Sequence, residues 1–111
     1  MRLTPDMLVS TYDMLRTCAP FRRWKLLHSD DVVFEVTHRK HEFGDYSDQP
    51  PKITLSSENK TLDELVRTMA HEMVHQHLHQ KGCRSWNKHG ALFNRAASLV
   101  CRKLGFDPAT F

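Results

Sequence analysis

The strongest constraint on the fold is the segment from Thr61 to Gly82, which carries both a helix start signal and a helix stop signal. Thr61-Leu-Asp-Glu64 has the capping-box pattern, in which the threonine hydroxyl accepts a bond from the N–H three residues on and the glutamate reaches back. Leu65 and Met69 then recur at helical spacing as part of an apolar face. The segment therefore predicts a capped amphipathic helix that runs to about residue 79 and stops at Gly82.

The same helix carries the motif His-Glu-x-x-His at residues 71–75. His71 and His75 stand one turn apart on one face, so both imidazoles can reach a single ion at the ~2.0–2.1 Å of zinc–nitrogen bonds. Glu72 is offset by about 100° around the axis, which puts it beside the ion and not on it. That position suits a base acting on a water that the ion activates.

Two further histidines on this helix are not predicted to be ligands. His79 continues the stripe but lies ~12 Å along the axis from His71, too far for one tetrahedral ion on a straight helix. We expect His79 to be a polar residue near the helix C-terminus, where the dipole favours a partly protonated ring. His77 points to a different face.

A catalytic zinc site needs a third protein ligand, and four downstream residues are candidates: Cys83, His89, Cys101 and Asp107. His89 ranks first, because it precedes Gly90 at the start of the last predicted helix and can be delivered from a second element across the first. Cys83 ranks second, with a small residue in a turn as its alternative interpretation.

Two other helices frame the chain. Thr4-Pro5 is a start signal and Ala19-Pro20 a stop, which predict a helix at roughly 5–18. A last helix is predicted from about 90 to 104, with Gly105 as its terminating residue.

Between these helices the apolar pattern changes to that of strands. Residues 32–36 alternate, 43–46 form a second strand weakened by its glycine, and 53–55 mark a third. Connections this short favour an antiparallel meander of about three strands. The expected fold class is α+β, with an N-terminal helix, a small sheet, a motif helix and a C-terminal helix in a single domain over residues 1–111.

Charge and cysteine usage bear on partners and compartment. The formal net charge is +3, and basic residues cluster after residue 80: Lys81, Arg84, Lys88, Arg95, Arg102 and Lys103. With Arg22, Arg23 and Lys25 around Trp24, they form either solvated faces or a nucleic-acid contact. Trp24 and Trp86 either pack in the core or stack on bases.

Three cysteines without a Cys-x-x-Cys pair do not indicate a disulfide framework. No apolar run approaches the ~20 residues of a membrane span, and no export signal is readable. We therefore expect a cytoplasmic protein without a membrane partner.

The motif residues resemble those of a known family. HEMVH followed at a distance by HGALF is similar to the SprT-like zincin metalloproteases, which include the Spartan DNA–protein crosslink proteases. The matching residues are His71, Glu72, His75, His89, Gly90 and Phe93. The resemblance spans roughly residues 4–107. It implies a minimal zincin-like protease domain with one zinc ion on His71, His75 and His89, and with Glu72 as the catalytic base.

Two departures from the family pattern stand out. Many relatives carry a zinc ribbon or another DNA-binding module, and the three scattered cysteines here cannot build a ribbon, which leaves recruitment to DNA to the basic surface or to a partner. Lys88 also replaces the polar residue that often precedes the His-Gly pair.

The function predicted is a zinc-dependent endopeptidase acting on protein or peptide, with DNA-associated proteins as a candidate target. Tyr46, Arg84 and His77 are candidates for stabilising the oxyanion, and strand 53–56, if at a sheet edge, could hold an extended substrate. The alternative is a non-catalytic module in which zinc pins two helices and the basic face binds nucleic acid or protein. A peptidase for one narrow target is a third possibility.

Overall fold

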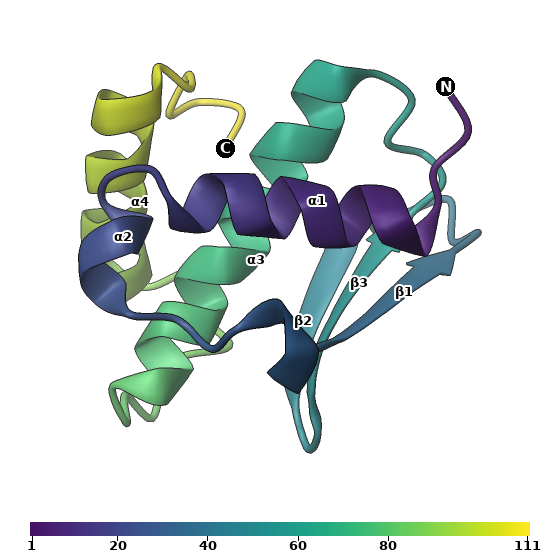
Figure 1. Cartoon of the computed structure of the whole chain (residues 1–111). Helices are drawn as coiled ribbons and strands as arrows, with labels where there is room; N and C mark the ends of the chain where they lie inside the picture. Colours follow the sequence, from purple (N-terminus) through teal and green to yellow (C-terminus); the bar gives the residue numbers. More distant parts are fainter.

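The longest helix, α3 (Leu62–Gln80), lies at the centre of the computed structural model and contacts α1 (Pro5–Arg16), α4 (Ala91–Leu104) and the sheet (Figure 1). All 111 residues are described. The predicted capping box is formed: the Glu64 N–H donates to Thr61 Oγ1 at 3.1 Å, and the Thr61 N–H donates to Glu64 Oε1 at 3.1 Å. Leu65 and Met69 are fully buried, which confirms the predicted apolar face.

The other helices follow their local signals closely. In α1, Thr4 Oγ1 accepts the Met7 N–H at 3.3 Å, and the helix ends at Arg16, two residues before the predicted end. α2 (Phe21–Trp24) is a single turn, and a 3-10 turn, η1, covers Ser29–Asp31. α4 ends at Gly105, whose φ of 81° lies in the left-handed region that favours glycine.

The sheet is mixed, so the prediction of a purely antiparallel meander was wrong, while the α+β class is confirmed. Its strands are β1 (Val33–Thr37), β2 (Gly44–Asp48) and β3 (Pro51–Ser56), in the order β1-β3-β2. β3 pairs antiparallel with β2 and parallel with β1. The chain passes from β1 to the far edge of the sheet, and the tight turn after β2 returns β3 between the two.

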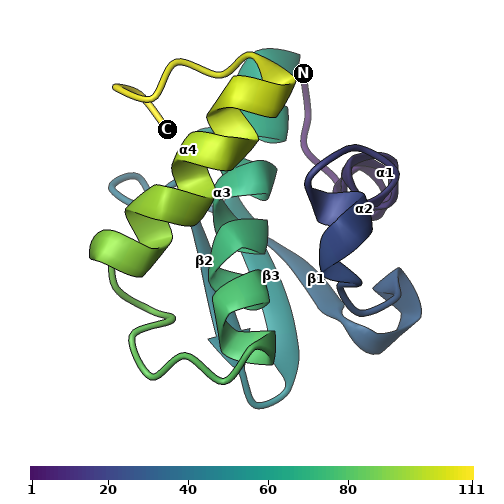
Figure 2. The ribbon, with the colours of Figure 1, turned by 90° about the vertical axis from the view of Figure 1, so that its left-hand side faces the viewer.

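One face of the sheet is covered by helices and the other is open (Figures 1 and 2). Phe34, Ile53 and Tyr46 are register partners and therefore share a face, where Tyr12 of α1 meets the Phe34 ring at 5.1 Å. The opposite face is polar, with Lys52 Nζ 3.7 Å from Glu35 Oε2 across the strands. α3 therefore packs against the helix-covered face next to the edge strand β2.

The helices converge on α3 from two sides. Figure 2 shows α4 crossing α3 on the side away from α1. The fully buried Gln76 side chain of α3 donates to the Tyr12 hydroxyl at 2.8 Å, which fixes α1 against α3. None of the helices combines the length and apolarity needed to cross a membrane.

Candidate metal centre

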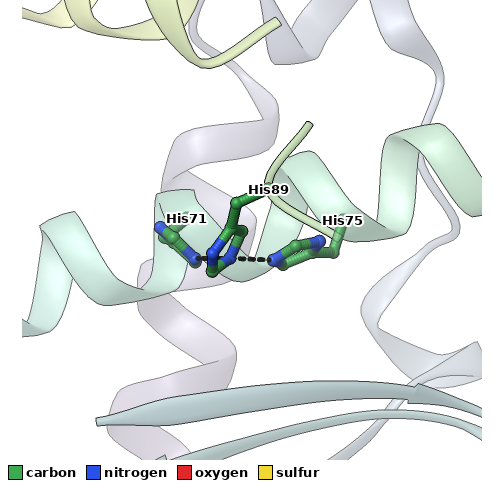
Figure 3. Close-up of side chains that lie close together, drawn as sticks. All are labelled: His71, His75 and His89. Atoms are coloured by element: carbon green, nitrogen blue, oxygen red, sulfur yellow. Dashed lines mark hydrogen bonds between the residues drawn. The ribbon is translucent and has the colours of Figure 1, made fainter. Parts of the chain in front are cut away.

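Three histidine side chains meet beside α3 (Figure 3). His71 and His75 project from successive turns of α3, and His89 reaches them from the loop before α4. The His89 Nε2 atom lies 3.2 Å from Nε2 of His71 and 3.1 Å from Nε2 of His75. The one-turn spacing and the return of His89 from a second element are both as the sequence predicts.

The outer ring nitrogens of both helix histidines are held by main-chain oxygens. Nδ1 of His71 lies 2.7 Å from the oxygen of Phe111, and Nδ1 of His75 lies 2.6 Å from the oxygen of Trp86. Because a carbonyl oxygen only accepts, each Nδ1 carries the hydrogen and each Nε2 keeps its lone pair. This is the tautomer that a metal ligand requires, fixed by a partner behind the ring.

Hydrogen bonds alone cannot satisfy this cluster. His89 Nε2 carries at most one hydrogen, which can reach only one of the two lone pairs that face it. A single cation among the three nitrogens would satisfy all of them. Tetrahedral zinc with bonds of ~2.0–2.1 Å separates its nitrogens by about 3.3–3.4 Å, close to the two distances from His89, and all three nitrogens lie within 4.8 Å of one another. The three histidines can therefore hold one metal ion.

The electrostatics of the rings favour the neutral form. Burial, followed by repulsion from His75 and His89, lowers the pKa of His71 to about 4 against the opposing bond to Phe111. Burial also lowers the pKa of His75, with His89 contributing. At neutral pH these two rings have no proton to lose before they bind a cation.

Glu72 is buried beside the cluster with no hydrogen bond to its carboxylate. Burial, together with the charges of Asp45 and Glu42, raises the pKa of Glu72 to about 8. A cation held by the neighbouring histidines would oppose this and favour the carboxylate. Such a carboxyl group can exchange a proton near neutral pH.

Gly44 explains how the edge strand comes so close to this carboxylate. A Cβ at Gly44 would lie 2.9 Å from Thr68 Cγ2 and 3.1 Å from Glu72 Oε2. The glycine that weakened the strand prediction is therefore what lets β2 pack against α3. A glycine inside a strand pattern is a recognised signal of close backbone approach, so this contact was predictable from Gly44.

Two clefts open on either side of Glu72, His71 and Gly44, which line both. One, of about 260 Å³, continues toward Phe43 and Phe111. The other, of about 290 Å³, continues past Tyr46 and Trp86 and includes the other two histidines. Together they form a path across the cluster along β2.

The free edge of β2 borders this path. Ser56 donates its N–H to the Phe43 oxygen at 2.8 Å, so by alternation residues 43, 45 and 47 bond to β3. The N–H and C=O groups of Gly44 and Tyr46 then point to the unpaired edge. Strand 53–56, considered as a substrate edge, is the central strand, so that prediction was wrong; the edge strand beside the clefts is β2.

The remaining candidates lie outside the cluster. His77 is buried against Trp24, with ring centroids 3.7 Å apart, and burial lowers the pKa of His77 to about 4. His79 faces β2, with Nδ1 3.2 Å from the Tyr46 hydroxyl and Nε2 3.5 Å from Asp48 Oδ2.

The other proposed third ligands have structural places of their own. Cys83 sits in the turn after α3, where its N–H donates to Leu78, and Cys101 is buried in α4. Asp107 caps a C-terminal turn, with Oδ1 accepting the Ala109 N–H at 2.9 Å.

Both tryptophans pack against protein side chains. Trp24 stacks on His77. Trp86 meets the rings of Tyr46 and His79 edge-on at 5.6 and 5.1 Å. The orienting roles of the Phe111 and Trp86 oxygens were missed, because no sequence pattern marks a backbone carbonyl that will meet a distant ring.

The fold and the site together define a class: an α+β protein in which a helical His-Glu-x-x-His motif and a distant histidine form a possible metal centre. The model of the SprT-like family matches residues 7–110, and the chain belongs to that family. Comparison with curated proteins and with solved structures gave no match.

Proposed function

We propose that the chain is a zinc-dependent endopeptidase with His71, His75 and His89 as the metal ligands and Glu72 as the general base. The observation that carries this proposal is the convergence of three Nε2 atoms, two of them in the ligand tautomer, beside a buried carboxyl group. Membership of the SprT-like family supports it.

The bound cation would supply Lewis acidity, polarising a peptide carbonyl and making a water easier to deprotonate. Glu72 takes the proton from that water as it attacks the carbonyl carbon. It then passes the proton to the leaving nitrogen as the C–N bond breaks. Burial raises the pKa of Glu72 to about 8 in the metal-free chain, which makes the carboxylate a stronger base for the first of these transfers.

The free edge of β2 suits an extended peptide. Gly44 and Tyr46 offer main-chain donors and acceptors along the clefts, so a substrate strand can pair there and pass over Glu72. The absence of a Cβ at Gly44 keeps the path clear beside the carboxylate.

Tyr46 is the best candidate for stabilising the oxyanion. It lines the cleft that contains Glu72 and the three histidines, whereas Arg84 lines neither cleft and His77 is stacked under Trp24. Burial, followed by the charge of Asp48, raises the pKa of Tyr46 to about 12, so the hydroxyl keeps its proton at physiological pH. In the substrate-free chain this hydroxyl lies 3.2 Å from Nδ1 of His79, so it would exchange that partner for the oxyanion.

A target among DNA-associated proteins is part of the proposal. All six basic residues after α3 are exposed: Lys81, Arg84, Lys88, Arg95, Arg102 and Lys103. Exposed cationic side chains of this kind attract phosphate backbones in a salt-dependent way. Cleavage should then rise when DNA is added, and the gain should shrink with salt.

A non-catalytic zinc-stabilised module is the alternative function. Such a module has no need of a buried carboxyl group beside the ion, and Glu72 therefore weighs against it. A closed site would also take a fourth protein ligand, and only three residues form the cluster.

The test compares the zinc-loaded wild type with Glu72→Gln and His89→Ala on an unfolded protein such as β-casein, with and without DNA. Glu72→Gln should keep zinc and the fold but lose cleavage. His89→Ala should lose zinc affinity by more than the about 10- to 100-fold typical of a residue that only orients a ligand.

His79→Ala is the matched control, because His79 stands on the same helix outside the cluster and should leave zinc binding unchanged. Full cleavage by Glu72→Gln would remove the proposed base. A wild type that binds zinc and cleaves nothing under either condition would favour the binding module.

A further inference from the structure

The cleft beside Gly44 has an aromatic end that the hydrolytic step does not use. Phe43 stands at its rim with 53% of its surface exposed, and Phe111 forms the facing side. Glu72 and His71 line the same cleft, so this end adjoins the place where a peptide bond would be cut.

The polar groups at this end are already satisfied within the protein. The Thr68 hydroxyl donates to Asn59 Oδ1 at 2.7 Å, which leaves its methyl group nearest to Gly44. The Arg67 guanidinium is bonded to Asp63 Oδ2 at 2.9 Å. The surface left for a ligand therefore consists of the phenyl rings of Phe43 and Phe111 and the methyl group of Thr68. The aliphatic part and the flat guanidinium face of Arg67 complete it.

The position of Phe111 is fixed and does not depend on a ligand. Its N–H donates to the Asp107 oxygen at 3.1 Å, its oxygen meets His71, and its ring lies 5.6 Å from Phe106 and 5.4 Å from His71. A ring held by a turn and by two aromatic neighbours gives the cleft a preformed wall.

We infer that this cleft is a specificity subsite that takes a large apolar or aromatic side chain of the substrate, with Phe43 and Phe111 as the selecting residues. The inference rests on the proposed peptidase function and specifies the kind of substrate side chain that the peptidase prefers beside the cut bond. Arg67 adds to the selection for aromatic residues, because its guanidinium plane can lie against an aromatic ring.

The direction in which a substrate strand pairs with β2 determines whether this cleft binds the residue before or after the cut bond. A peptide pairing antiparallel to β2 runs from the Asp48 end toward the Gly44 end. The residue on the carboxyl side of the cut bond then enters the cleft of Phe43 and Phe111. The residue on the amino side faces Tyr46 and Trp86.

The first experiment maps the bonds that the zinc-loaded wild type cuts in β-casein by mass spectrometry. Phe, Tyr, Leu and Met should follow the cut at least about tenfold more often than Ala or Lys, relative to their abundance. Phe43→Ala and Phe111→Ala should reduce this preference, and Phe111→Leu should restore part of it. Met14→Ala, an exposed apolar residue on α1, is the matched control and should keep it.

The second experiment needs no cleavage. The dipeptides Phe-Ala and Ala-Ala, which mimic the carboxyl-side product, are titrated by NMR into the zinc-loaded and the metal-free wild type. Phe-Ala should bind roughly tenfold more tightly, as expected for burying most of a phenyl group, and Phe111→Ala should remove the difference. Phe43→Ala should reduce the difference in affinity without altering the melting temperature, since Phe43 is exposed.

The outcomes separate the two claims. Cleavage with no preference on the carboxyl side, or with the preference on the amino side, overturns the subsite while the peptidase function stands. If nothing is cleaved, the peptidase function fails, and the dipeptides alone decide the subsite. Equal binding of the two dipeptides overturns the proposed subsite.

Discussion

The backbone oxygen of Phe111 lies 2.7 Å from Nδ1 of His71, a residue 40 positions earlier in the chain. In the same way, the backbone oxygen of Trp86 lies 2.6 Å from Nδ1 of His75. Two loops far apart in sequence thus fix the tautomers of two neighbouring rings on one helix. The ligand geometry therefore depends on how these loops fold as well as on the histidines.

Asp107→Ala should weaken zinc binding although Asp107 is not in the cluster. Its Oδ1 accepts the Ala109 N–H at 2.9 Å and shapes the turn that presents Phe111 to His71. Loss of an orienting partner costs about 10- to 100-fold in metal affinity. Competition with a chromophoric chelator measures this, and Asp107→Asn, which keeps an acceptor oxygen, is the control. Unchanged affinity in Asp107→Ala would show that the turn does not depend on this bond.

Gly44→Ala should destabilise the fold. The new methyl group would lie 2.9 Å from Thr68 and 3.1 Å from the Glu72 carboxylate, so strand and helix must separate. Overpacking of this kind costs roughly 1–3 kcal/mol in the free energy of unfolding. Urea denaturation gives the value. Ser47→Ala, on the outward face of the same strand, should stay within about 0.5 kcal/mol of wild type.

In the metal-free protein, the contribution of Glu72 to stability should fall as pH rises toward 8. The pKa of Glu72 is raised from its ordinary 4.5 to about 8, so between these values the folded chain holds a proton that the unfolded chain has released. The contribution of Glu72 to the free energy of unfolding therefore decreases with pH over this window, and comparison with Glu72→Gln isolates it from the contributions of the buried histidines. Glu72→Gln lacks this group, so its advantage over wild type should grow from pH 5 to pH 8, by on the order of a few kcal/mol at most.

Urea midpoints in the presence of a chelator measure this difference. Glu35→Gln, an exposed carboxylate on the open face of the sheet, should follow wild type at both pH values. Added zinc should shrink the gap, because a nearby cation favours the charged form of Glu72. A constant gap from pH 5 to pH 8 would mean that Glu72 is ionised throughout.

Tyr46→Phe should reduce kcat by roughly 10²–10³ with little change in KM or zinc content, as for the loss of an oxyanion donor. Tyr46 lines the cleft of the cluster, and its raised pKa of about 12 keeps the hydroxyl protonated. Arg84→Ala, which changes a residue outside both clefts, should have wild-type kinetics in the absence of DNA. The opposite pattern would assign the role to Arg84.

The helices were predictable because their signals are local. The capping box at Thr61 and the left-handed Gly105 each depend on a few neighbouring residues, and both are formed. The predicted convergence of the cluster also follows from short-range geometry: one helical turn separates His71 from His75, and the loop to His89 is long enough to return.

The sheet order was not predictable from the same signals. Strand positions follow from alternation, but whether β3 pairs beside β2 alone or enters between β1 and β2 depends on what α1 and α3 cover. In the observed order Ile53 is the partner of both Phe34 and Tyr46, so the three residues form one row. For this reason the strand with a free edge near the histidines is β2, whereas the sequence suggested β3.

The origin of the third histidine has a consequence for folding. His89 stands in the loop before α4, and α3 is the main element that α4 touches. An ion shared by all three rings would link the start of α4 to the middle of α3. A chelator would then loosen α4 as well as stop hydrolysis, and amide hydrogen exchange in α4 should quicken when the ion is withdrawn.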